Sequence, residues 1–128
     1  MSSTATRFTL LALFVLAAGC KSSDFADIDL GTVTVGADSI HVNQEAAFGP
    51  NETTKYALKA SPTKPDKIEC WYGAEAATTP HVTASYDAND DDFDCLVPTP
   101  ATTLPTDKLW FTVTTGATHA NGSVTPHP

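Results

Sequence analysis

The sequence predicts an all-β fold, and three features of its 128 residues point to it. Apolar and polar residues alternate over most short segments, which places every second side chain on one face of a strand. No segment shows the 3.6-residue period of an amphipathic helix. Turn signals built from Gly, Pro, Asn and Asp separate the segments at short intervals, which favours a sandwich or, as the alternative, a small β-barrel.

The first predicted strand changes phase along its length. Ile28 and Leu30 share one parity. Val33 and Val35 have the opposite one, so we expect a bulge or bend at Gly31. With this strand included, about seven strands are expected, at residues 28–35, 39–43, 55–60, 67–72, 81–86, 92–97 and 108–114.

The later segments alternate cleanly and predict the core. The side chains expected to face inward are Ile40, Val42, Tyr56, Leu58, Ala60, Ile68, Cys70, Tyr72, Val82, Ala84, Tyr86, Phe93, Cys95, Val97, Leu109, Phe111 and Val113. The β-domain should therefore cover residues 28–115. Residues 116–128 are mostly polar, and we expect a loose C-terminal tail there.

The N-terminus has the pattern of a secretory signal peptide. Residues 8–16 (FTLLALFVL) are apolar, Arg7 precedes them, and small residues follow. The apolar run is too short to cross a bilayer, which takes about 20 residues.

The end of this run, Leu16-Ala17-Ala18-Gly19-Cys20, resembles the lipobox of bacterial lipoproteins, although Ala17 stands where leucine is commonest. The resemblance implies that residues 1–19 are removed, that Cys20 carries acyl chains, and that residues 20–27 form a tether. Several acyl chains give stable anchoring, whereas one alone is marginal. An ordinary cleaved signal with an incidental cysteine is the alternative.

The residue after the cysteine bears on the location. In enterobacterial sorting Asp at this position favours the inner membrane, and this chain has Lys21. The resemblance therefore implies a lipid-anchored protein of the bacterial cell envelope, in the outer membrane, facing the periplasm or the surface.

Two cysteines remain once Cys20 is lipidated. An even pair in an oxidising compartment predicts a disulfide between Cys70 and Cys95, which also share the inward phase. The alternative is a two-cysteine metal site, but no histidine stands at ligand spacing from either residue.

The segment Asp91–Cys95 (DDFDC) loosely resembles the segment before the second cysteine of immunoglobulin domains, with Phe93 in place of Tyr. This resemblance implies an immunoglobulin- or fibronectin-like sandwich. It is one of architecture only, because Cys70 and Cys95 are too close in sequence for the usual immunoglobulin bridge.

An acidic run between two predicted strands suggests a calcium site. The candidate ligands are Asp87, Asn89, Asp91 and Asp92. Calcium takes six to eight hard oxygen ligands, which Asp and Asn supply. An EF-hand is excluded, because its glycine position is Asp92 and its last ligand position is Pro98. The alternative is a solvated loop without an ion.

Trp71, Trp110 and Leu96 all have the outward phase. If their strands share a sheet, they form one exposed apolar patch of the kind that contacts proteins or glycans. The alternatives are that a loop or the tail covers this face, or that the phase is off by one.

The composition narrows the function. With 7 basic and 15 acidic residues, the formal net charge is −8, which disfavours nucleic acid as a partner. No catalytic or nucleotide-binding motif is present, so we expect no enzyme. The expected function is non-catalytic binding of a protein or glycan at the envelope. The alternatives are a structural or assembly component of an envelope complex, or a weak calcium-binding adhesion-type module.

Overall fold

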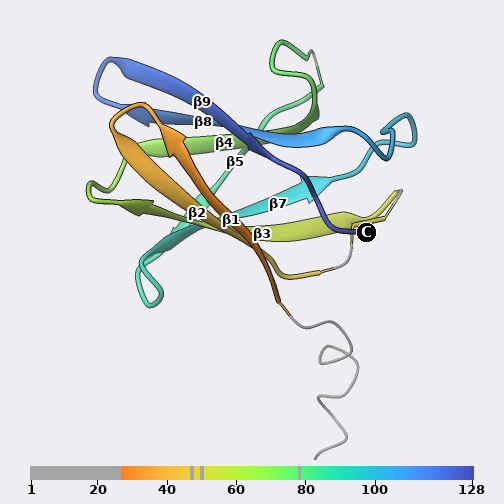
Figure 1. Cartoon of the computed structure of the whole chain (residues 1–128), viewed down its shortest axis with the longest axis horizontal. Helices are drawn as coiled ribbons and strands as arrows, with labels where there is room; N and C mark the ends of the chain where they lie inside the picture. The colour runs from red at the N-terminus through yellow and green to blue at the C-terminus, as the bar shows by residue number, and fades with distance from the viewer. Residues whose placement is uncertain (1–26, 47, 50, 78) are drawn as a thin grey trace, which may run out of the picture.

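A computed structural model describes residues 27–46, 48–49, 51–77 and 79–128. Two antiparallel sheets pack face to face as a β-sandwich (Figure 1). The strands are β1 (Ile28–Val35), β2 (Asp38–Gln44), β3 (Thr53–Ser61), β4 (Lys67–Gly73), β5 (Val82–Thr83), β6 (Ser85–Asp87), β7 (Asp92–Pro98), β8 (Lys108–Thr115) and β9 (Thr118–Val124). The predicted signal peptide, Cys20 and nearly all of the predicted tether lie outside the described residues.

The strand order confirms the predicted sandwich. One sheet has the order β1-β2-β3-β7-β6 and the other β5-β4-β8-β9. Without β1 these orders correspond to A-B-E-D and C′-C-F-G, the arrangement of immunoglobulin-like sandwiches. Strand β1 extends the first sheet beyond the position of strand A.

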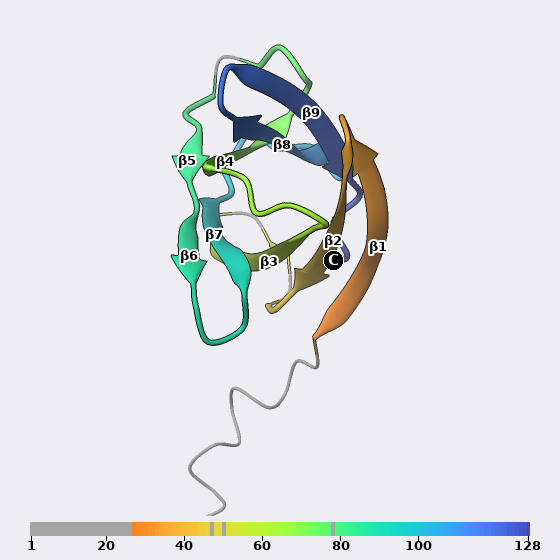
Figure 2. The same cartoon turned by 90° about the vertical axis from the view of Figure 1, so that its left-hand side faces the viewer.

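The segment of residues 81–87 contributes a strand to each of the two sheets. The sequence predicts one strand here, but β5 pairs with β4 and β6 pairs with β7. At the junction, Ala84 N donates to Ile68 O at 2.8 Å. Figure 2 shows β5 and β6 following one another along one edge of the molecule, where they link the two layers.

The bulge predicted in the first strand is confirmed. The pairing of β1 with β2 shifts register between Asp29 and Gly31. Gly31 has a φ of 99°, which a residue with a side chain rarely adopts. The shift keeps Val33 and Val35 on the inner face opposite Ile40 and Asp38.

The prediction of a loose tail over residues 116–128 is wrong. Strand β9 pairs with β8 from Thr115↔Thr118 to Leu109↔Val124. Its inward residues before Val124 are the small Ala120 and Gly122, so the alternation is easily missed. The lack of a side chain is required at Gly122, because a Cβ there would lie 2.7 Å from Val35 Cγ2.

Nearly all of the predicted inward residues form the core between the sheets. Tyr86 is an exception, because it lies at the sheet edge and is 38% exposed. The predicted disulfide is confirmed: Cys70 and Cys95 are bonded, with their Cα atoms 6.5 Å apart. It joins β4 to β7, the positions of strands C and E.

The strand position of Cys95 differs from that of the second immunoglobulin cysteine, to whose preceding segment residues 91–95 bear a resemblance in sequence. That cysteine belongs to strand F, whereas Cys95 lies on the counterpart of strand E. The short sequence separation of 25 residues is therefore a consequence of a different bridge between the same two layers.

Within the part of the chain that the structure describes, no helix has the length and hydropathy needed to cross a membrane.

Candidate functional site

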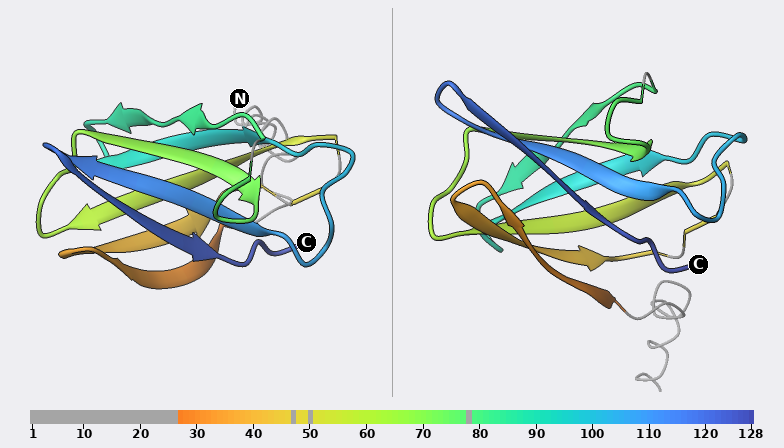
Figure 3. Two further views of the ribbon diagram at one scale, coloured as in Figure 1. Left: turned by 90° about the horizontal axis from the view of Figure 1, so that it is seen from above. Right: turned by 45° about the horizontal axis from the view of Figure 1, so that its top comes forward.

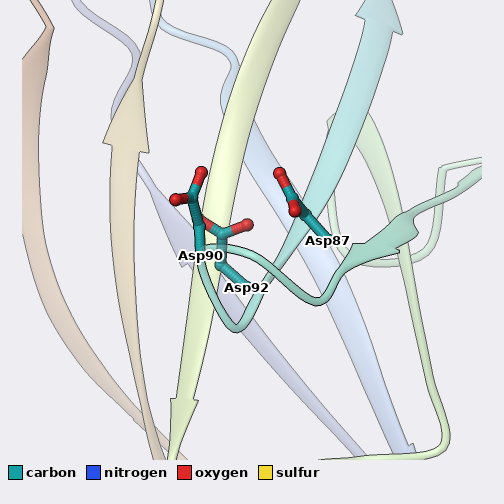
Figure 4. Close-up of side chains that lie close together, drawn as sticks. All are labelled: Asp87, Asp90 and Asp92. Carbon is teal, nitrogen blue, oxygen red and sulfur yellow. The ribbon is translucent and has the colours of Figure 1, made fainter.

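The acidic turn between β6 and β7 brings three carboxylates together. Asp87 and Asp92 are direct cross-strand partners, and the turn returns Asp90 to the same side. One oxygen from each of these three residues lies within 4.8 Å of the others. Figure 4 shows the three side chains extending in the same direction from the turn.

The other two predicted ligands take part in hydrogen bonds that shape the turn. Asn89 donates its backbone N–H to Asp87 Oδ1 at 2.9 Å, and Asp91 Oδ1 accepts the Tyr86 hydroxyl at 2.6 Å. The structure therefore brings together two of the four predicted residues, Asp87 and Asp92, in one cluster of carboxylates. The prediction missed Asp90, although its parity with Asp92 was a signal for a shared side.

Asp92 has an unusual environment within the cluster. Partial burial is the main cause that raises the pKa of its carboxyl to about 6, and the charges of Asp94, Asp90 and Asp87 add to it. Its Oδ1 atom is buried and has no hydrogen-bond partner among the described residues. An ion in this position would supply the missing positive charge.

The nearby lysines form no ion pair with the three clustered carboxylates among the described residues. Lys55 Nζ lies 3.1 Å from Glu45 Oε1 and 3.8 Å from Asp94 Oδ2. Lys59 Nζ donates to the backbone oxygen of Asp90 at 3.1 Å. The cluster could therefore offer about three of the six to eight oxygens that calcium takes, with water completing the shell.

The predicted patch of Trp71, Trp110 and Leu96 does not exist. The two tryptophans do face one another across β4 and β8 on the outer side of their sheet. Leu96 is 55% exposed but lies on β7, in the other sheet.

Trp71 is also covered, with only 1% of its surface exposed. The His81 ring stacks on it at 3.9 Å between centroids, and its Nε1 donates to Ala74 O at 2.8 Å. Trp110 is half-buried and donates to Gly73 O at 3.0 Å. The alternation predicted the face correctly but could not predict that the chain after β4 folds over it.

A feature that sequence reasoning missed lies at the end of the sandwich where β1 begins. An apolar cavity of about 260 Å³ there is lined by Phe48, Thr99, Thr103, Pro105, Pro126 and Pro128. Binding pockets for small molecules are usually about 300–1,000 Å³, so this cavity is small for a ligand site. Its residues come from three distant segments, and no local pattern reveals such a meeting.

Comparison of the chain with protein-family models, with curated proteins and with solved structures gave no match.

Proposed function

We propose that this chain is an exported, lipid-anchored protein of the bacterial envelope whose β-sandwich acts as a non-catalytic binding module. The observation that carries the proposal is the disulfide between Cys70 and Cys95. Stable disulfides are typical of oxidising compartments outside the cytosol. The bond uses two of the three cysteines and leaves Cys20, at the end of the apolar run, as the odd one.

The intact mass of the detergent-extracted protein tests this proposal. We expect a chain that begins at Cys20 and carries acyl groups, and that gains two hydrogens when the disulfide is reduced. A C20S variant is the matched control and should leave the membrane fraction while keeping the disulfide. An unacylated wild-type mass would refute the anchor.

The partner of the module is a protein or a glycan, and the acidity of the domain supports a partner other than nucleic acid. The covered tryptophans give no support to a binding face at Trp71. A structural role in an envelope complex is the alternative, and it predicts a fixed stoichiometry after mild extraction and crosslinking. A purely monomeric extract would contradict the structural role.

Calcium binding at the acidic turn is a second candidate function. The specific observation that favours it is the buried, unpartnered Oδ1 atom of Asp92 within a cluster of three carboxylates. We expect 10 mM calcium to stabilise the wild-type protein by about 1.4 kcal/mol if the dissociation constant is about 1 mM.

The melting temperature with calcium and with a chelator measures this effect. The D92N variant should lose the response, and the D91N variant should keep it, because Asp91 faces Tyr86. An equal response in wild type and D92N would assign the effect to another place or to ionic strength.

A further inference from the structure

We propose that the end of the sandwich formed by residues 98–106 rests on the membrane that anchors Cys20, with the acidic turn directed away from it. This inference depends on the lipid anchor proposed above. The occupant of this surface is the bilayer itself.

The contacts of β1 identify which end lies nearest the anchor. Ile28 pairs with Gln44 at the end of β2. The Gln44 side chain is fully buried and forms two bonds with the backbone of His127, at 2.6 and 2.8 Å. The start of β1 and the C-terminal residues therefore lie close together.

The segment 98–106 belongs to the same end. Thr103 and Pro105 line the apolar cavity together with Pro126. The turns at 36–37 and 116–117 lie at the opposite end, which Figure 3 shows away from the C-terminus, and the acidic turn follows β6 on that side.

The length of the tether limits the orientation. Seven residues lie between Cys20 and Ile28, and the eight residue steps span at most about 29 Å when fully extended. A strand of nine residues such as β3 is about 30 Å long. The end near Ile28 can therefore reach the bilayer with a relaxed tether, whereas the far end needs a fully stretched one.

The chemistry of the near end suits a lipid surface. Residues 95–106 contain no charged side chain, and Leu104 is 59% exposed. The free energy of an exposed apolar side chain falls when it enters the boundary between headgroups and acyl chains.

The backbone around Leu104 is already hydrogen-bonded. Leu104 N donates to Asp107 Oδ2 at 2.7 Å, and Asp107 N donates to Leu104 O at 3.0 Å. Thr103 N donates to Pro100 O at 3.0 Å, and Pro105 has no N–H to satisfy. Since unpaired backbone groups are costly where water is scarce, this turn can enter the interface at little expense.

The charge of the opposite end favours the same orientation. Asp87, Asp90, Asp91 and Asp92 are gathered there. Bacterial membranes carry anionic lipids, whose surface potential repels such a cluster. The membrane therefore repels the acidic turn least when that turn points away from it, and the surface that faces the lipid is the uncharged segment 95–106, which is flanked by the charged residues Glu52 and Asp107.

Tryptophan quenching in vesicles tests this orientation. The full-length protein, purified with its acyl groups, is placed in phosphatidylethanolamine and phosphatidylglycerol vesicles that contain brominated acyl chains. The L104W variant introduces an indole at the near end, and A117W, at the exposed turn between β8 and β9, is the matched control. The wild-type emission of Trp71 and Trp110 is subtracted from both.

We expect the bromolipids to quench about half or more of the indole emission added by L104W and to leave that added by A117W unchanged. Vesicle flotation and the intact mass of the protein, which reports acylation of Cys20, are measured on the same samples. If the protein floats but the added emission of L104W is not quenched, or that of A117W is quenched instead, the proposed orientation is wrong. The lipid anchor is not contradicted by that result. If the protein does not float and Cys20 is unmodified, both the proposed anchor and the proposed orientation are wrong.

Discussion

Asp92 is partly withdrawn from water and surrounded by other carboxylates, and both effects oppose its ionisation. Its pKa is raised from an ordinary value of 3.8 to about 6, so the folded protein holds this proton more tightly than the unfolded chain. The stability that this proton contributes is fully present below pH 3.8 and is lost as the pH rises through 6. At pH 7 the ionised residue therefore destabilises the fold.

The D92N variant should be more stable than wild type at pH 7, by about 0.5–1.5 kcal/mol, because water around the partly exposed carboxyl screens much of the repulsion. Near pH 4 the difference should be small, because Asp92 is then largely protonated in the folded protein. Thermal unfolding at the two pH values, without calcium, measures this difference.

The control for this prediction is D91N. Asp91 has a φ of 55°, which asparagine tolerates well, but its side chain bonds to Tyr86 rather than entering the cluster. The D91N variant should be no more stable than the wild-type protein at pH 7. An equal effect of D92N at both pH values would contradict the electrostatic explanation.

Strand β9 shows how a strand can be hidden by small residues. Gly122 faces the interior, and a Cβ there would lie 2.7 Å from Val35 Cγ2 and 3.0 Å from the Phe111 ring. The absence of a side chain allows β9, at the edge of one sheet, to approach β1 at the edge of the other. This close approach brings the two layers together on the side opposite β5 and β6.

The G122A variant should destabilise the protein by about 1–3 kcal/mol, because the added methyl group overpacks this contact. Chemical denaturation measures the loss. The neighbouring S123A variant, on the outer face of β9, should change the stability by less than about 0.5 kcal/mol. A G122A protein as stable as wild type would mean that β9 does not pack here.

At the scale of the whole molecule, a disulfide bond links the two layers in addition to the connections of the backbone. The disulfide joins β4 to β7 and closes a loop of 25 residues. Closing such a loop restricts the unfolded chain and is worth about 3–4 kcal/mol. Both cysteines are fully buried, so the bond also occupies the centre of the core.

The double variant C70A/C95A should lose about 3–4 kcal/mol of stability. In a domain of this size this corresponds to a fall in the melting temperature of about 10 °C or more. Reduction of the wild-type protein should produce a comparable loss. If the double variant and the wild-type protein have the same melting temperature, the disulfide contributes no stability and the core alone supplies it.

Local patterns were enough to predict the class of the fold and much of its core. The inward faces of β2, β3, β4, β7 and β8 followed from alternation, because successive side chains of a strand point to opposite sides. The bulge at Gly31 followed from the same rule, since the phase changes there. The pairing of Cys70 with Cys95 required only that both face inward and that no other cysteine of the domain remains.

The acidic turn was predictable only in part. Asp87 and Asp92 end up opposite one another because a short turn separates two strands. The turn's own hydrogen bonds decided the rest, turning Asp91 toward Tyr86.

The sequence by itself determined which residues alternate, which segments extend and which cysteines can pair, because these depend on the chain's local geometry. The tertiary structure alone decided that His81 covers Trp71, that the chain changes sheets at Ala84, and that β9 completes the second sheet. Each of these depends on contacts between segments that are distant in sequence, or on the absence of a side chain at Gly122, and alternation carries no information about either.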